Sequence, residues 1–208
     1  SRDSRCVWRV SLDDRQVVEW LTNKSSTTTT QFTPYTLSVT SRRLLVTSLS
    51  NELLLYGADG VELKRVPLPD TMTSLQHAVE TSRGTFIVSH SKPQPRVCEV
   101  NVDGHVTRIY CDQQKLSNPV YLSSDSDGRI FVADYNKHRV LLLNSETLEL
   151  ERVLLDTQQH QLTRRPHRLC YTEQTRQLAV GSWSPLSVTS CDESTLSDVS
   201  DCVQLFTV

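Results

Sequence analysis

The sequence predicts an all-β fold of repeated four-stranded antiparallel sheets, and three observations lead to this prediction. Residues 116–154 contain four short apolar runs separated by turn-forming residues, among them Asp127-Gly128 and Asn144-Ser145, as in an antiparallel meander. Amphipathic helix periodicity is not sustained anywhere in the sequence. The valines expected in successive second strands are 42, 44 and 48 residues apart (88 − 46, 132 − 88 and 180 − 132), at Val46, Val88, Val132 and Val180.

A lone four-stranded sheet cannot bury both of its faces, so such sheets stack on copies of themselves. A period of roughly 40–50 residues is typical of the blades of a β-propeller. We therefore predict a single β-propeller over residues 1–208, complete or a fragment of a longer one, with four complete or near-complete repeats and a partial N-terminal repeat. The approximate units are 1–22 (partial), 33–70, 71–118, 119–165 and 166–208.

The elements follow in order from local patterns. Alternating residues in 7–10 and 17–20, around an Asp13-Asp14 turn, predict an N-terminal hairpin. The next two complete units each contain an Asp-Gly pair (residues 59–60 and 103–104), which is the strongest short-range signal for a hairpin turn. Residues 89–96 carry Pro93 and Pro95, which cannot donate to a strand ladder and so predict a loop. Residues 181–201 are predicted to form a long loop between the second and third strands of the last unit.

The closure of the ring stays open at this stage. The last unit ends after its third strand, and the N-terminal hairpin can supply the fourth, which would remove exposed sheet edges. However, the hairpin also brings a third strand that the last unit already has. Three arrangements fit: a four-bladed ring with an extra strand, a five-bladed ring with one incomplete blade, and an open fragment completed by another chain or by self-association.

The third complete unit resembles a known family. Asn118-Pro119-Val120 followed by residues 127–140, DGRIFVADYNKHRV, is similar to an NHL repeat, closely in this unit and loosely in the others over about 34–208. Where this unit has Asp134, the other units carry Ser48, Ser89 and Ser182. The chain resembles the C-terminal propellers of tripartite-motif NHL proteins, and the resemblance implies a β-propeller that binds RNA or protein. The family also includes extracellular modules, kinase sensor domains and a metal-using amidating lyase, so the fold alone does not set the function.

Clusters that could carry chemistry have structural interpretations. In the family pattern, Asp134 and Asn136 tie down the turn between strands through backbone hydrogen bonds. Asp125 and Asp127 predict a plain turn, because the rest of a calcium loop is missing. No histidine pair has the spacing of a zinc site, although His77 and His167 fall in the same first-strand column, which would face the central channel. We predict no catalytic residue, no metal site and no cofactor, with a metal-dependent lyase or hydrolase of propeller fold as an alternative.

The cysteines and the charge bear on the compartment. Cys191 and Cys202 bracket a Ser/Asp-rich loop and form the candidate disulfide in an oxidising environment. The absence of any C-x-x-C pair favours reduced thiols and a cytoplasmic rather than an extracellular location. The net charge of −2 and the lack of an apolar run near ~20 residues predict no membrane partner.

Binding is the function that these observations favour. In a propeller, the loops between second and third strands and between fourth and first strands emerge on one face. The candidate partner-binding residues on this face are Lys92, Arg96, Tyr135, Lys137, His138, Arg139, Arg164, Arg165 and Trp183. Acidic residues share the same loops, and a mixed face with aromatic side chains suits a protein or peptide partner. We therefore predict a non-catalytic recognition module or scaffold, with RNA binding by the cations and aromatic rings as the alternative.

Overall fold

The computed structural model describes residues 6–11, 15–21, 33–40, 43–49, 51–110, 116–158, 162, 164–182 and 202–208. Its strands form five antiparallel sheets. The N-terminal hairpin consists of β1 (Val7–Val10) and β2 (Val17–Leu21). Blade 1 consists of β3 (Pro34–Val39), β4 (Arg43–Ser48), β5 (Glu52–Gly57) and β6 (Glu62–Pro67). Blade 2 consists of β7 (Thr73–Glu80), β8 (Phe86–Lys92), β9 (Arg96–Val100) and β10 (Val106–Ile109).

The second half of the chain repeats the same unit. Blade 3 consists of β11 (Pro119–Ser124), β12 (Arg129–Asp134), β13 (Arg139–Asn144) and β14 (Leu150–Asp156). A single 3-10 turn, η2 (Tyr135–Lys137), joins β12 to β13. Blade 4 consists of β15 (Pro166–Thr172), β16 (Gln177–Ser182) and β17 (Cys202–Thr207). The prediction of an all-β propeller with four repeats and a partial N-terminal one is confirmed.

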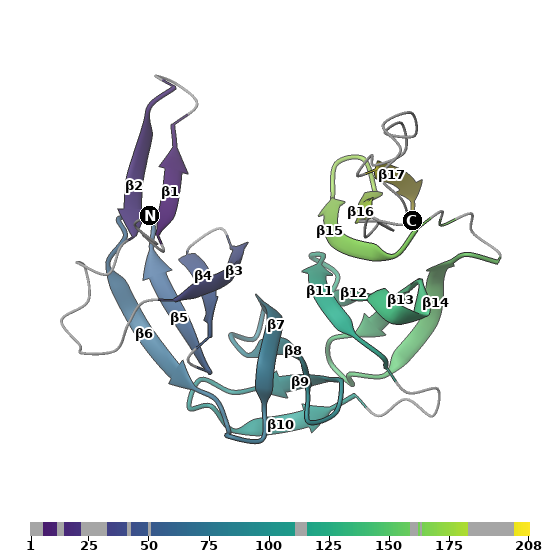
Figure 1. The fold of residues 1–208 in the computed structure, drawn as a ribbon, viewed down its shortest axis with the longest axis horizontal. Coiled ribbons are helices and arrows are strands. Elements are labelled where there is room, and N and C mark those ends of the chain that lie inside the picture. Colours follow the sequence, from purple (N-terminus) through teal and green to yellow (C-terminus); the bar gives the residue numbers. More distant parts are fainter. Residues whose placement is uncertain are drawn as a thin grey trace, which may run out of the picture.

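The blades follow one another along an arc that is open between the hairpin and blade 4 (Figure 1). The first strands β3, β7, β11 and β15 lie on the inner side of the arc, and consecutive first strands contact one another. These four strands therefore form the wall of a central channel.

Apolar contacts between neighbouring blades hold the arc together. Each of the four second-strand valines, Val46, Val88, Val132 and Val180, is 0 % exposed and belongs to a different apolar cluster. Each cluster joins one blade to the preceding sheet. The residue before the valine, as in Leu45, Ile87 and Phe131, points to the following blade. Second strands are thus apolar on both faces because each is packed between two neighbours.

Turn chemistry supports the same arrangement. Gly60, Gly104 and Gly128 of the three Asp-Gly pairs all have a positive φ, between 78° and 87°, which only glycine adopts without strain. At Gly104 a side chain would overlap the carbonyl oxygen of Pro67 in blade 1. This turn is therefore also a point of close backbone contact between blades 1 and 2.

Strand register corrects two alignments that the sequence predicted. Asp134 lies two residues after Val132. The residue at the equivalent position of blade 2 is His90 and not Ser89, because Ser89 is one residue after Val88 and pairs with His77 on the first strand. His77 is equivalent to Tyr121 and Arg168, not to His167. Each first strand contains a register shift near its start. The shift has the same place in all four units, so equivalent positions follow from the pairing of each first strand with its second strand.

The N-terminal hairpin does not complete blade 4. Among the described residues, β1 and β2 pair only with each other, and Val7, Leu21 and Trp20 pack on Leu44 and Tyr56 of blade 1. In the part of the chain that the structure describes, β17 pairs with β16 alone. The arc is consequently open, as in the third arrangement that the sequence allowed.

Candidate functional site

The loop that follows β12 is built around a buried carboxylate. Asp134 is 0 % exposed, and its Oδ1 accepts hydrogen bonds from the backbone N–H groups of Ser117 and Asn118, both at 3.0 Å. Its Oδ2 accepts from Nε of Arg139, which is 6 % exposed, at 3.0 Å. The structural interpretation of Asp134 is confirmed, although the backbone that it holds belongs to the loop before β11. Arg139, a candidate partner-binding residue, lies inside the blade and is bound to this carboxylate.

Three of the candidate residues come together on the loop face. Arg165 donates from Nε to Nε2 of His138 at 3.2 Å, and its guanidinium lies 5.2 Å from the ring centroid of Tyr135. The same tyrosine ring meets the edge of His167 with centroids 6.0 Å apart. We call Tyr135, His138, Arg165 and His167 the loop-face cluster. Tyr135 and His138 come from η2 and its C-terminal end in blade 3, and Arg165 and His167 come from the segment that enters blade 4.

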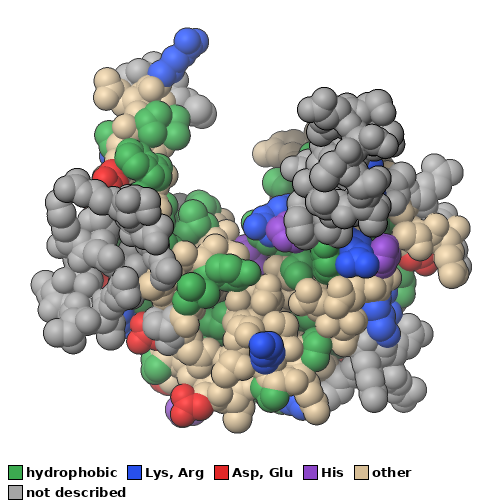
Figure 2. Space-filling model, viewed as in Figure 1, with side chains coloured by type: hydrophobic (Ala, Val, Ile, Leu, Met, Phe, Trp, Pro, Cys, Tyr) green, Lys and Arg blue, Asp and Glu red, His purple; other side chains and the backbone are tan. Residues whose placement is uncertain are grey.

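The remaining candidates are more dispersed. Lys92 is exposed and Arg96 is half-buried, and Arg96 donates to Oε1 of Gln94 at 3.1 Å in the β8–β9 loop. Lys137 is exposed and Arg164 is half-buried, and each directly precedes a residue of the loop-face cluster in the sequence. Trp183 lies outside the described residues. In Figure 2, basic and histidine side chains gather on the right of the central hollow, over blades 3 and 4.

The first strands place a second group of rings across the channel. The ring of His77 stacks on Tyr121 with centroids 3.8 Å apart, and its Nε2 lies 3.1 Å from the carbonyl oxygen of Leu37. His77 in blade 2 therefore bridges blades 1 and 3. The guanidinium of Arg168 in blade 4 lies 5.1 Å from the centroid of Tyr121. We call His77, Tyr121 and Arg168 the channel group. Nη1 of Arg168 donates to the carbonyl oxygen of His167 at 3.0 Å, so the channel group contacts the loop-face cluster.

Burial sets the protonation of the channel histidine. His77 is 1 % exposed, and this burial lowers its pKa to about 4, against the hydrogen bond to Leu37, which favours the charged form. The ring is therefore neutral at pH 7. Because Nε2 faces a carbonyl oxygen, it carries the proton, and Nδ1 is left as a buried acceptor that has no partner among the described residues.

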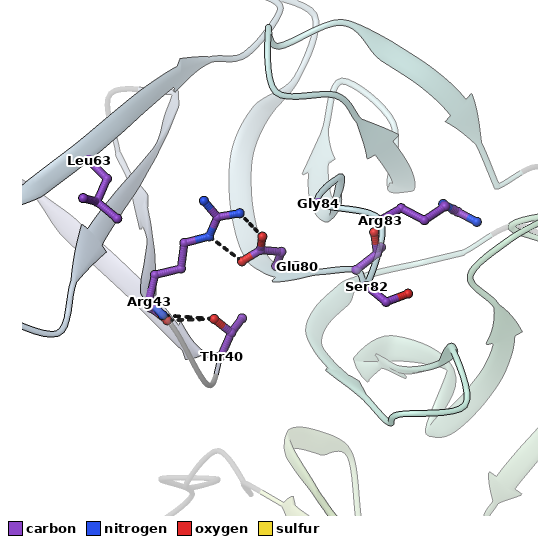
Figure 3. Close-up of a pocket in the computed structure, with 8 residues that line it drawn as sticks. Thr40, Arg43, Leu63, Glu80, Ser82, Arg83 and Gly84 are labelled. Atoms are coloured by element: carbon purple, nitrogen blue, oxygen red, sulfur yellow. Dashed lines mark hydrogen bonds and ion pairs between the residues drawn. The ribbon is translucent and has the colours of Figure 1, made fainter.

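Two cavities open at the other end of the channel. A cavity of about 290 Å³ lies among the first strands and is lined by His77, Tyr121 and Tyr171, among others. A larger one of about 640 Å³ lies between blades 1 and 2 and shares Thr40 and Glu80 with it. In Figure 3, Arg43 of blade 1 reaches across this second cavity to the carboxylate of Glu80 in blade 2. Neither cavity could be predicted from the sequence, because the residues that line each one lie far apart along the chain.

The structure also bears on metal-binding and cysteine chemistry. Among the described residues, no group of three or more His, Cys, Asp or Glu side chains is arranged to hold a metal ion. Cys6 and Cys170 carry free thiols. The candidate disulfide joins Cys202 to Cys191, and Cys191 lies outside the described residues. Within the described ranges, no helix is long and apolar enough to cross a membrane.

One known family matches the sequence of blade 3. Residues 116–141, which include Asp134, η2 and Arg139, match the model of the NHL repeat. The chain carries an NHL repeat. The matched NHL repeat contributes Tyr135 and His138 to the loop-face cluster, whereas Arg165 and His167 follow it in the chain. No curated protein sequence matches the chain.

Solved structures show the same fold in proteins of different kinds. A chain in the crystal structure of a nidogen/laminin complex superposes with a TM-score of 0.64 at 19 % identity, over 86 % of this chain and 64 % of that chain. Virginiamycin B lyase from Staphylococcus aureus gives 0.61 at 13 % identity, over 100 % and 64 %. A streptogramin B lyase gives 0.63 at 14 % identity, over 99 % and 62 %. The chain thus spans less than two thirds of each of these structures, and the likeness concerns the fold alone.

Proposed function

We propose that this chain is a non-catalytic recognition module that binds a protein or peptide partner through the loop face of blades 3 and 4. The observation that carries the proposal is the loop-face cluster, in which two blades join a cation, a tyrosine ring and two imidazoles. Arginine and tyrosine are the residue types that most often anchor protein interfaces. A relative of this fold was solved in a nidogen/laminin complex, which supports a role in protein interaction.

The other candidate residues extend this surface. Lys92 and Arg96 of blade 2, with Lys137 and Arg164 beside the loop-face cluster, are proposed to form its charged rim, where single contacts contribute little energy but set orientation and association rate. The proposed surface is therefore an anchor at blades 3 and 4 with a basic margin toward blade 2.

The experiment that tests this function is partner capture with matched charge reversals. Arg165→Glu changes the loop-face cluster, and Arg152→Glu makes the same change on the exposed outer strand β14. Proteins captured by the wild-type chain and by Arg152→Glu, but lost with Arg165→Glu, would support the loop face as the interface. Equal capture by all three proteins would show that the face is wrong.

RNA binding and metal-dependent catalysis are the competing functions. Binding of single-stranded RNA that weakens steeply with salt would favour the nucleic-acid function. Two structural relatives are lyases, so elemental analysis of the purified protein is the direct test of a metal. A stoichiometric metal bound to the folded chain would overturn the non-catalytic proposal.

A further inference from the structure

The loop-face cluster and the channel group form one continuous series of contacts. From the loop face inward, His138 contacts Arg165, and Arg165 lies over Tyr135. The edge of His167 then meets Tyr135, and Arg168 contacts His167 and lies over Tyr121. The series therefore alternates basic groups and rings, with Tyr121 and Tyr135 from blade 3 and Arg165 and Arg168 from the entry of blade 4.

Each guanidinium keeps N–H groups that its contacts in the structure do not use. A guanidinium carries five N–H donors in a planar fork. For Arg165, only Nε has a hydrogen-bond partner among the described residues, and both terminal nitrogens have none. For Arg168, only Nη1 has partners in the same part of the chain, both on His167. Each arginine thus keeps two N–H-bearing nitrogens for an external acceptor.

Among the described residues, the charge of this pair is not balanced by an ion pair. Within the described ranges, no carboxylate forms an ion pair with Arg165 or Arg168. Within the matched NHL repeat, the acidic residue nearest in sequence to these arginines is Asp134, which is buried and already forms an ion pair with Arg139. Arg168 is exposed and Arg165 is half-buried. Two accessible forks that have no ion pair within the described ranges match the geometry of carboxylates, which bind guanidinium groups in a bidentate manner.

From this arrangement we propose that the partner is an acidic peptide segment whose carboxylate side chains bind Arg165 and Arg168. This inference rests on the proposed function and adds the chemistry of the partner. The two arginines are three residues apart on a segment that contains a register shift, so their Cα atoms are at most about 10 Å apart. An extended peptide with two carboxylates separated by a similar distance, two or three positions apart, fits both.

The rings argue for a peptide rather than a nucleic acid. Single-stranded RNA is bound by stacking bases on open aromatic faces. Tyr135 is only 9 % exposed and already has Arg165 and His167 as ring neighbours, and Tyr121 has His77 and Arg168. In this series the aromatic rings support the guanidinium groups and offer no open platform to a base.

Synthetic peptides test the inference directly. We would measure fluorescence anisotropy with labelled peptides of about ten residues that carry two glutamates one to four positions apart in a Ser/Gly background, each with a glutamine counterpart. The expected result is tightest binding at a separation of two or three, and about tenfold weaker binding for the glutamine peptides. Arg165→Glu and Arg168→Glu should each weaken binding at least about tenfold, and Arg152→Glu should leave it within about twofold.

A second variant separates fork geometry from charge. Arg168→Lys keeps the positive charge but loses the planar fork, so it should bind the glutamate peptide less tightly than the wild type and more tightly than Arg168→Glu. Urea unfolding of each variant checks that the fold is retained. If Arg168→Lys binds like the wild type, the bidentate geometry is wrong.

The outcomes distinguish this inference from the proposed function. If glutamate and glutamine peptides bind equally and both are weakened by Arg165→Glu, the loop face is an interface but the acidic partner is wrong. If single-stranded RNA binds and the peptides do not, the partner is a nucleic acid and the inference is overturned. If the folded wild-type chain binds none of the glutamate peptides, the inference is also overturned, while capture of a protein that depends on Arg165 would still support the proposed function.

Discussion

Replacing His77 by phenylalanine should remove one specific source of pH-dependent stability. His77 is buried in the channel, where burial lowers its pKa to about 4 from an ordinary value of 6.5. In the unfolded chain the ring is solvated and titrates near its ordinary value. Between these two pH values, the unfolded state therefore binds a proton that the folded state does not, so stability falls as pH is lowered. Phenylalanine keeps an aromatic ring beside Tyr121 and binds no proton.

The size of the effect follows from the two pKa values. Each pKa unit corresponds to about 1.4 kcal/mol, so the interval from 6.5 to about 4 corresponds to roughly 3 kcal/mol. Near pH 7 the variant should lie within about 1 kcal/mol of the wild type, since it loses only the hydrogen bond to Leu37. Relative to the variant, the wild type should then lose roughly 3 kcal/mol as the pH falls from about 7 to about 4.

Urea unfolding followed by circular dichroism, at steps between about pH 4 and pH 8, measures this difference. The quantity to plot is the free energy of unfolding of the wild type minus that of His77→Phe. His90 also has a lowered pKa because it is buried, but it is present in both proteins and cancels in the difference. A flat difference curve across this interval would show that His77 is not held neutral by burial, and the reasoning about the channel would be wrong.

Four further predictions concern the buried carboxylate, the blade contact, acid stability and the open arc. Asp134→Ala should cost about 3–5 kcal/mol in urea unfolding, because it leaves the buried Arg139 without its carboxylate; a loss below about 1 kcal/mol would refute this. Gly104→Ala should lower the melting temperature, because its positive φ and the overlap with blade 1 both disfavour a side chain. Hydrogen bonds from three side chains outweigh burial and hold the pKa of Glu99 below its ordinary value of 4.5. The ionised carboxylate therefore contributes to the free energy of unfolding above that pH, and this contribution is lost as the pH falls below it. Glu99→Gln should make the free energy of unfolding less dependent on pH in this acid range. Leu205 is 64 % exposed on β17, so if the apolar exposed side of β17 drives self-association, Leu205→Lys should abolish any concentration-dependent rise in mass measured by light scattering.

The fold could be predicted from the sequence because one physical requirement is repeated four times. A second strand that packs between two sheets must be apolar on both faces, so Val46, Val88, Val132 and Val180 recur at nearly one period. Asp-Gly pairs mark turns for an independent reason, the need for a positive φ. The pairs of blades 1 and 2 lie in the same turn, 44 residues apart (104 − 60), in agreement with the period of the valines, whereas Gly128 lies in the turn between the first and second strands of blade 3.

Register was harder to predict than the repeat. All four first strands have a shift at the same place, so it does not offset one unit from another. The pairing of His77 with His167 was wrong because the connection between first and second strands varies in length: His77 lies 11 residues before Val88 (88 − 77), whereas the equivalent Arg168 lies 12 before Val180 (180 − 168). The assignment of Ser89 was wrong because His90, like Asp134, follows its second-strand valine by two residues. The error changes function as well as alignment, because the residue that shares the channel level with His77 and Tyr121 is the cation Arg168.

Burial separates the residues that define the repeat from those that are free to recognise a partner. Asp134 and Arg139 are charged residues of the NHL pattern, yet both are buried, they bind each other, and Asp134 also binds the neighbouring backbone. Charges that stabilise the inside of a blade in this way do not by themselves specify a ligand. Arg165 and Arg168 lie outside the matched residues 116–141 and use the matched repeat only as a support for their guanidinium groups. Propellers with the same repeat can therefore differ in partner through the segment that enters the next blade, and in this chain that segment carries two accessible arginines.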